Sequence, residues 1–360
     1  MKFVLFYHSL VSDWNHGNAH FLRGIAAELI KRGHQVNVYE PADGWSLTNL
    51  CAKHGEAPLK AFANAYPTLT TNFYRELNLK TVLDGADIVL VHEWTDPGVV
   101  AGIGQMRRQN RFALFFHDTH HRAVTAREQM EAYDLRFYDG VLAYGKVLTE
   151  LYLKAGWTNR AWTWHEAADT RVFKPIPDIA KTRDLVWIGN WGDNERAAEL
   201  EEFFIRPVKT SNLKATVHGV RYPEQARAAL KAAGIEFRGW LPNFHVPRAF
   251  AGARATVHVP RRPYVQALPG IPTIRTFEAM ACGIPLISAF WDDREHLFRP
   301  GKDYLLARNG DEMQRHLMEV LKKPGLATEL AGHGLETIRS RHTCAHRVDQ
   351  LLEIYDELKL

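Results

Sequence analysis

The chain has 360 residues, 46% of them hydrophobic, a length that suits two domains of ordinary size better than one. Its 45 basic residues nearly balance 41 acidic ones, and the net charge of +4 is compatible with an anionic ligand or an ordinary solvated surface. No stretch approaches the roughly 18 apolar residues of a membrane span, and no secretory signal is recognisable. Three cysteines without metal-ligand spacing indicate reduced thiols, so we expect a cytoplasmic protein.

The first half of the chain alternates short apolar runs with amphipathic ones, a pattern typical of a parallel α/β sheet. We expect strands over 1–7, 35–40, 88–92, 112–116, 140–144 and 160–164. We expect helices over 21–32 and 146–155, with one or two more over 51–80. The strand, loop, helix, strand order at the start is that of a nucleotide-binding fold. The Gly-x-Gly-x-x-Gly spacing of a dinucleotide site is absent, which disfavours a dehydrogenase.

Polar residues follow two of these predicted strands. Residues 93–98 come after the third, and residues 117–122, with the sequence HDTHHR, come after the fourth. Because functional residues gather at the carboxyl ends of strands, we expect an acceptor site with a general base in these loops. The histidines and Asp118 are also possible zinc ligands, but no helical i, i+4 pair and no cysteine supports a metal site.

The second half repeats the alternation after a linker-like segment near Pro175. We expect strands over 185–188, 215–218, 255–259 and 286–289. We expect helices over 194–204, 224–233, 247–251, 311–321, 327–333 and 342–358. Arg196 would lie in the first turn of its helix, where the helix dipole disfavours a cation, and a bound diphosphate would remove the conflict. A solvated arginine is the alternative.

The clearest local prediction concerns the stretch from Pro269 to Asp293. It predicts a loop, a short helix that Thr273 caps and Gly283 ends, and a strand over 286–289. Glu278 lies within this apolar helix. Its carboxylate could accept a hydrogen bond from a ribose hydroxyl, or it could be an exposed residue that the helix dipole favours.

The run from Arg275 to Pro285, RTFEAMACGIP, resembles the nucleotide-sugar signature of glycosyltransferases with the GT-B fold, especially the CgeB-like branch. The resemblance implies two Rossmann-like parallel-sheet domains facing a cleft, with the last helix crossing back to the first domain. It implies an acceptor-side domain over 1–175, completed by 343–360, and a nucleotide-sugar-binding domain over 176–342. Gly270 departs from the pattern, because many relatives have a glutamate at the matching position.

The resemblance also implies roles for individual residues. Glu278 would hold the donor ribose, while His117 and Asp118 would face the donor sugar as catalytic candidates. The remaining candidate donor contacts are loop residues at the sheet edges and at the start of the signature helix: Gly17, Asn18, Gly189, Asn190, Arg196, Gly239, Trp240, Arg261, Thr273, Ile274 and Arg275. Ordinary structural roles, such as a helix-entry loop, a surface turn or a packed tryptophan, are the alternatives at these loops.

We therefore expect a glycosyltransferase that moves a sugar from a nucleotide-sugar donor to an acceptor, with retention and without a metal or other cofactor. The sequence leaves open the donor, the oligomeric state and the acceptor, which can be a small molecule, a glycan, a protein or a nucleic acid. Two alternatives use the same fold. One is a sugar-nucleotide epimerase or sugar phosphorylase, and the other is a non-catalytic nucleotide-binding protein, which the glycine at 270 favours.

Overall fold

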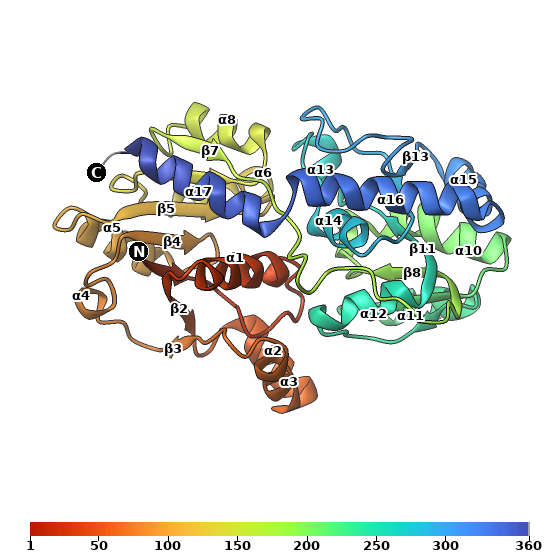
Figure 1. Ribbon diagram of the computed structural model, residues 1–360, viewed down its shortest axis with the longest axis horizontal. Coiled ribbons are helices and arrows are strands. Elements are labelled where there is room, and N and C mark those ends of the chain that lie inside the picture. Colours follow the sequence, from red (N-terminus) through yellow and green to blue (C-terminus); the bar gives the residue numbers. More distant parts are fainter. Residues whose placement is uncertain (359–360) are drawn as a thin grey trace. The chain divides into compact units, whose positions relative to one another are not determined.

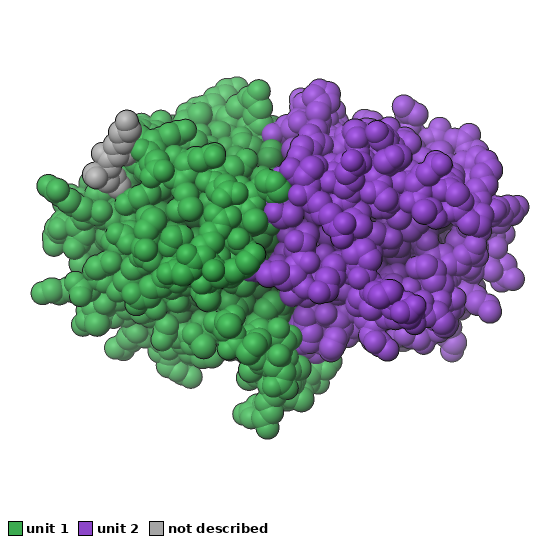
Figure 2. Space-filling model, viewed as in Figure 1, with its two compact units in different colours: residues 1–166, 344–360 green, residues 167–343 purple. Residues whose placement is uncertain are grey.

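The computed structural model describes residues 1–358 and divides into two compact units (Figure 2). Unit 1 consists of Met1–Glu166 together with the carboxyl-terminal segment from Cys344, and unit 2 is Ala167–Thr343. The units therefore divide between Glu166 and Ala167, whereas the sequence pattern placed the domain boundary at Pro175.

Unit 1 is built on a seven-stranded parallel sheet with the strand order β3-β2-β1-β4-β5-β6-β7 (Figure 1). The central strands β1 and β4 are almost wholly buried, which explains their continuous apolar sequences. The strands are β1 (Lys2–Phe6), β2 (Gln35–Pro41), β3 (Asn72–Tyr74), β4 (Ile88–His92), β5 (Ala113–Asp118), β6 (Gly140–Ala143) and β7 (Ala161–Thr163). The helices are α1 (Ala19–Lys31), α2 (Trp45–His54), α3 (Ala57–Ala65), α4 (Leu79–Val82), α5 (Pro97–Arg107), α6 (Arg122–Thr125), α7 (Arg127–Glu131), α8 (Lys146–Lys154) and α17 (Cys344–Leu358).

The closing helix α17 packs against α1 of unit 1 (Figure 1). Arg32 forms an ion pair with Asp349 at 2.6 Å, and the Trp164 indole donates a hydrogen bond to the Arg347 carbonyl at 2.8 Å. The expected return of the last helix to the first domain is confirmed.

Unit 2 contains a six-stranded parallel sheet with the order β10-β9-β8-β11-β12-β13. Alternate residues of its strands form a cluster of buried apolar side chains on one face of the sheet. The strands are β8 (Arg183–Ile188), β9 (Ala215–His218), β10 (Glu236–Phe237), β11 (Ala253–His258), β12 (Leu286–Ala289) and β13 (Leu305–Ala307). The helices are α9 (Ala197–Leu200), α10 (Arg206–Thr210), α11 (Glu224–Ala232), α12 (Val246–Ala251), α13 (Arg262–Gln266), α14 (Ile274–Ala281), α15 (Gly310–Lys322) and α16 (Pro324–Arg341).

Two helix predictions in unit 2 are corrected. The predicted helix over 194–204 is a 3₁₀ turn at Asp193–Glu195, then α9, a π turn at Glu201–Ile205 and α10. Pro207 lies in the first turn of α10 and has no N–H to donate to the preceding turn, which interrupts the α-helical hydrogen bonds at the π turn. The short helix predicted over 327–333 is instead part of α16. This helix passes through Gly334, where an added Cβ would lie 3.1 Å from the Asp303 carbonyl oxygen, so the glycine allows close packing.

In each sheet the strand order reverses beside the first strand of the unit, between β1 and β4 in unit 1 and between β8 and β11 in unit 2. Open parallel sheets bind ligands outside the carboxyl ends of the strands at such a reversal. The residues that follow these four strands are therefore the candidate site residues.

Candidate functional site

Arg196 lies at the strand reversal of unit 2, and only 8% of it is exposed. Its Nη1 donates to the Val259 carbonyl at 3.2 Å, and its Nη2 donates to the Asn190 carbonyl. The guanidinium lies 5.0 Å from the centroid of the Trp187 ring. Its Nε has no hydrogen-bond partner among the described residues. Arg196 also forms no ion pair with a carboxylate in residues 1–358. A buried cation with only neutral partners is costly, so this arrangement favours a bound anion.

Two further arginines lie within electrostatic reach of Arg196. Burial, with the positive charges of Arg261 and Arg275, lowers the pKa of Arg196 to about 9. Arg261 forms an ion pair with Glu195 at 2.8 Å, and Arg275 forms one with Glu278. Unit 2 thus gathers three arginines from the segments after β8 and β11 and from the first turn of α14, a distribution suited to a diphosphate.

The turn after β8 has a structural role that the sequence did not indicate. A Cβ at Gly189 would lie 2.6 Å from the Trp187 ring, so packing alone requires glycine there. The Asn190 side chain accepts a hydrogen bond from the Val220 N–H at 3.1 Å, while its carbonyl receives Arg196. Gly189 and Asn190 therefore hold the turn that positions Arg196.

Thr273 precedes α14 but does not cap it with its side chain, contrary to the prediction. Its hydroxyl lies 3.0 Å from Nε2 of His258, whose Nδ1 lies 2.8 Å from the Ser288 hydroxyl. Since Ser288 donates its own proton to the Ala289 carbonyl at 2.7 Å, Nδ1 of His258 is the donor and Nε2 accepts from Thr273. Burial, aided by the nearby Arg196 charge, lowers the pKa of His258 to about 3, so the imidazole is neutral.

The start of α14 is left open to an anion because the Thr273 hydroxyl points to His258. The first intrahelical bond joins the Thr276 N–H to the Thr273 carbonyl at 3.0 Å. The N–H groups of Ile274 and Arg275 precede it and have no intrahelical acceptor. Backbone N–H groups at the start of a helix bind phosphate.

Glu278 is fully buried, so the alternative of an exposed carboxylate is wrong. Its Oε1 accepts from the Asn243 side chain at 3.0 Å, and its Oε2 pairs with Arg275. Asn243 begins a 3₁₀ turn directly after the segment with Gly239 and Trp240. Gly239 has a φ of +70° with open space around the position of a Cβ, and its carbonyl accepts from the Gly219 N–H at 2.8 Å. The fold therefore connects Glu278 to the turn expected to receive the donor base.

Gly270 has a φ of +97°, a backbone conformation that disfavours glutamate. A Cβ built on it would lie 3.1 Å from Oε1 of Glu295. The Glu295 carboxylate, from the loop after β12, thus lies beside Gly270, the position where many relatives have a glutamate. The sequence alone did not reveal this proximity.

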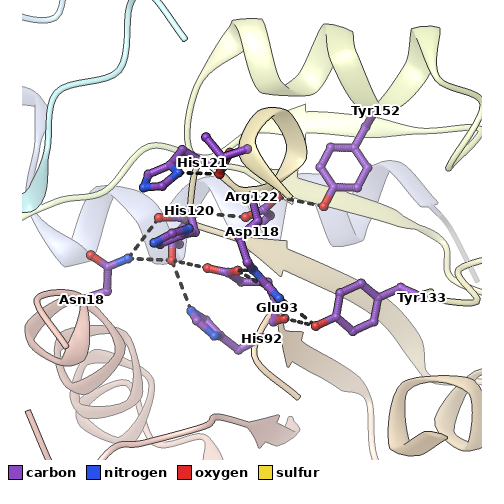
Figure 3. A network of polar contacts seen from close by, with 11 residues as sticks. Asn18, His92, Glu93, Asp118, His120, His121, Arg122, Tyr133 and Tyr152 are labelled. Atoms are coloured by element: carbon purple, nitrogen blue, oxygen red, sulfur yellow. Dashed lines mark hydrogen bonds and ion pairs between the residues drawn. The ribbon is translucent and has the colours of Figure 1, made fainter. Parts of the chain in front are cut away.

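In unit 1 a buried network connects the carboxyl ends of β4 and β5 (Figure 3). Arg122 pairs with Glu93 at 2.7 Å, while Asp118 accepts from the Tyr152 hydroxyl at 2.8 Å and from the His120 N–H at 3.0 Å. Burial raises the pKa of Glu93 to about 8 and that of Asp118 to about 6. Both carboxylates have no exposed surface, and their oxygens are engaged by protein groups.

His117 and Asp118 belong to β5 itself and not to the loop that the sequence predicted, because their backbones pair with β4 and β6. The His117 ring lies between Phe21 and Trp164, at centroid distances of 5.8 and 4.9 Å, and burial lowers its pKa to about 3. Only 1% of His117 is exposed. The catalytic roles expected of these two residues stay predictions.

Gly17 and Asn18 are partly exposed at the start of α1. The Asn18 side chain donates to the Thr119 hydroxyl at 2.6 Å and thereby connects this loop to the end of β5. The structure therefore brings Asn18 to the network of Glu93 and Arg122.

Residues 196–353 match a family model described as glycosyl transferase-like. Sucrose-phosphate synthase from Thermosynechococcus elongatus superimposes over 99% of each chain with a TM-score of 0.68 at 15% identity. The structural likeness over nearly the whole chain shows the GT-B fold. Anabaena HepE in complex with UDP is similar over 99% of this chain and 100% of its own, with a TM-score of 0.68 at 15% identity. T4 phage BGT in complex with UDP and Mn²⁺ is similar over 99% of this chain and 100% of its own, with a TM-score of 0.62 at 14% identity.

No curated protein matches this chain, and its placement in the CgeB-like branch stays a prediction. Within residues 1–358, no three or more His, Cys, Asp and Glu side chains are placed to hold a metal ion. Over the same residues, no helix has the length and apolar character needed to cross a membrane.

Proposed function

We propose that the chain is a glycosyltransferase, that its unit 2 binds a nucleoside diphosphate sugar, and that the sugar is transferred to an acceptor hydroxyl with retention and without a metal. The observation that carries the proposal is the buried Arg196, a cation with only carbonyl partners beside Arg261 and Arg275. A diphosphate supplies the negative charge that this group of arginines lacks.

The proposed roles follow from the contacts of each residue. Arg196, Arg261 and the N–H groups at the start of α14 would bind the diphosphate and stabilise the charge that develops on it as it leaves. Arg275 would turn from Glu278 to the phosphate, which would free the carboxylate to accept a ribose hydroxyl. The complexes of HepE with UDP and with UDP-glucose support a uridine nucleotide as the first ligand to test.

Two features support the finer parts of the proposal. The arginines supply positive charge where a metal ion otherwise would, which supports metal independence. Retention is supported by Glu93 and Asp118, which are buried and engaged by Arg122 and Tyr152 and thus unsuited to take the acceptor proton. In the proposed step, the bond from the sugar carbon to the phosphate oxygen breaks and a bond to the acceptor oxygen forms on the same face. The acceptor proton passes to a phosphate oxygen.

The test is thermal stabilisation by UDP, GDP, dTDP, ADP, CMP and their sugar conjugates. A ligand at 100 times its Kd stabilises the native state by about 2.7 kcal/mol. We expect one nucleotide to raise the melting temperature of the wild type and of Arg227→Met, a control arginine exposed on α11, but to raise that of Arg196→Met and Glu278→Gln much less. A wild type that responds to no nucleotide, or an Arg196→Met variant that responds fully, contradicts the proposal.

The finer parts need two further measurements. Equal stabilisation by the nucleotide in EDTA and in Mn²⁺ is the expected result for metal-independent binding, and the BGT complex with Mn²⁺ makes this comparison necessary. The anomeric configuration of the product, read by proton NMR, decides between retention and inversion. Product formed without any acceptor would favour an epimerase or phosphorylase.

A further inference from the structure

Three histidines meet at the strand reversal of unit 1, beside the network of Asn18, Glu93 and Arg122. His8 follows β1, His92 is the last residue of β4, and His16 lies in the loop before α1. Their ring centroids are 4.0 Å apart for His8 and His16, 5.3 Å for His8 and His92, and 6.2 Å for His16 and His92. Each is at most 8% exposed. Three imidazoles therefore converge where an open parallel sheet binds ligands.

The tautomer of His92 follows from its one hydrogen bond (Figure 3). Its Nε2 lies 3.2 Å from the Thr119 hydroxyl, which accepts from Asn18 at 2.6 Å and donates to Glu93, 3.4 Å away. Because the single hydroxyl proton is directed to Glu93, Nε2 of His92 is the donor. Its Nδ1 is therefore a buried lone pair, and it has no hydrogen-bond partner among the described residues.

The other two rings leave further polar atoms without partners. His16 donates to the Ser9 carbonyl, and its buried Nε2 has no partner within residues 1–358. Neither ring nitrogen of His8 has one in the same part of the chain. Burial lowers the pKa of all three histidines, that of His8 to about 3, so the rings are neutral. The cluster thus presents three nitrogen lone pairs and one N–H that have no hydrogen-bond partner among the described residues. Buried polar groups without hydrogen bonds destabilise the protein unless a ligand supplies the missing partners.

The surroundings of the cluster indicate the chemical class of that ligand. Trp45, 38% exposed, stacks on His8 at 5.8 Å with an angle of 18° between the rings, and Trp94 lies 6.1 Å from His8. The guanidinium of Arg122 lies 3.9 Å from the Trp94 ring centroid but is paired with Glu93. The other charged groups nearby are also engaged: Arg23 pairs with Asp13 at 3.0 Å, and Glu40 accepts from the Leu10 N–H at 2.7 Å. Aromatic faces with neutral hydrogen-bond acceptors suit a ligand with apolar C–H faces and hydroxyl groups.

We propose that His8, His16, His92 and Trp45 form the acceptor subsite, and that the acceptor is a neutral sugar ring or polyol whose hydroxyls donate to the imidazole nitrogens. This inference rests on the proposed function, because it names the acceptor class of that reaction. The three imidazoles orient the hydroxyl, and the proton still leaves with the donor phosphate. We do not propose that the cluster binds a metal, since no three His, Cys, Asp or Glu side chains in residues 1–358 are placed to hold a metal ion.

The test is calorimetric titration of the UDP-saturated protein with the methyl glycosides of glucose, galactose, mannose and N-acetylglucosamine, with myo-inositol, and with methyl glucuronide. Methyl glucuronide differs from methyl glucoside by a carboxylate in place of the hydroxymethyl group. We expect at least one neutral ligand to bind, and we expect a charged counterpart to bind at least tenfold more weakly. His8→Phe and Trp45→Ala should each weaken the neutral ligand at least tenfold. His54→Phe and Phe73→Ala alter exposed rings of the same unit and should leave its Kd unchanged.

The outcomes separate this inference from the proposed function. His8→Phe and Trp45→Ala should keep the full thermal response to UDP, which reports on unit 2 and shows that the variants are folded. If UDP binds but no neutral ligand does, the acceptor inference is wrong and the donor site stands. Tighter binding of methyl glucuronide, or binding of Zn²⁺ that His8→Phe abolishes, also overturns it. If UDP itself has no effect on the wild type, the proposed function fails first.

Discussion

Replacing Arg196 with methionine should stabilise the ligand-free protein while it removes nucleotide binding. Burial and the neighbouring arginines lower the pKa of Arg196 from 12.5 to about 9, so the folded state disfavours the charged form at every pH below about 9. This difference corresponds to a cost of about 5 kcal/mol. Methionine avoids the cost, but it gives up the hydrogen bonds to Asn190 and Val259, each worth about 1–2 kcal/mol. The net gain expected is about 1–3 kcal/mol.

Thermal unfolding with and without UDP measures both effects in one experiment. Each kcal/mol shifts the melting temperature of a domain of this size by about 2–4 °C, so Arg196→Met should melt several degrees above the wild type without ligand. With saturating UDP, the wild type should rise and the variant should not. Arg227→Met, at an exposed position of α11, should change the stability by less than about 0.5 kcal/mol and keep the UDP response.

Two results would refute the reasoning on Arg196. If Arg196→Met is destabilised by about 2 kcal/mol or more, the protein itself satisfies the cation and there is no energetic argument for a bound anion. If the variant is stabilised but still responds fully to UDP, the cation is strained for a reason other than the diphosphate.

Three further predictions concern the ion pair of Arg122 with Glu93, the buried carboxyl group of Glu40 and the hydroxyl of Thr273. Arg122→Met should lower the free energy of unfolding in urea by about 3–5 kcal/mol, because it leaves Glu93 buried and unpaired. The double variant with Glu93→Gln should recover more than half of the lost stability, and a double variant as unstable as Arg122→Met would contradict the prediction. Burial raises the pKa of Glu40 to about 7, so the stability that this residue contributes is complete below pH 4.5 and is lost as the pH rises through 7. Between pH 5 and 8 the wild type should lose up to about 3 kcal/mol of unfolding free energy in urea, whereas Glu40→Gln should not. Parallel pH profiles of the two proteins would refute this. Thr273→Val should lower the free energy of unfolding by about 1 kcal/mol, because it removes the hydroxyl that donates to His258. The variant should keep its thermal response to UDP, since the proposed phosphate contacts at this helix end are backbone N–H groups. Loss of the response would show that the hydroxyl contacts the ligand.

The apolar runs of the sequence by themselves determined most of the sheets. The strands over 88–92, 215–218 and 286–289 were predicted with the bounds that the structure has, because a strand covered on both faces is largely apolar along its length. The helix after Thr273 and its end before Gly283 also follow from local signals. The order of these elements, with the signature around Glu278, was sufficient to predict the GT-B fold.

The tertiary structure decided what the polar residues contact. Local pattern could not tell that Glu278 would be buried against Asn243, 35 residues away, or that no carboxylate would pair with Arg196. His8 follows β1 and His92 ends β4, two strands far apart in the chain that the sheet places side by side. The physical reason is that periodicity reports which face of an element is buried, whereas charge pairing and hydrogen bonding at the strand ends depend on which distant loops the completed sheet brings together.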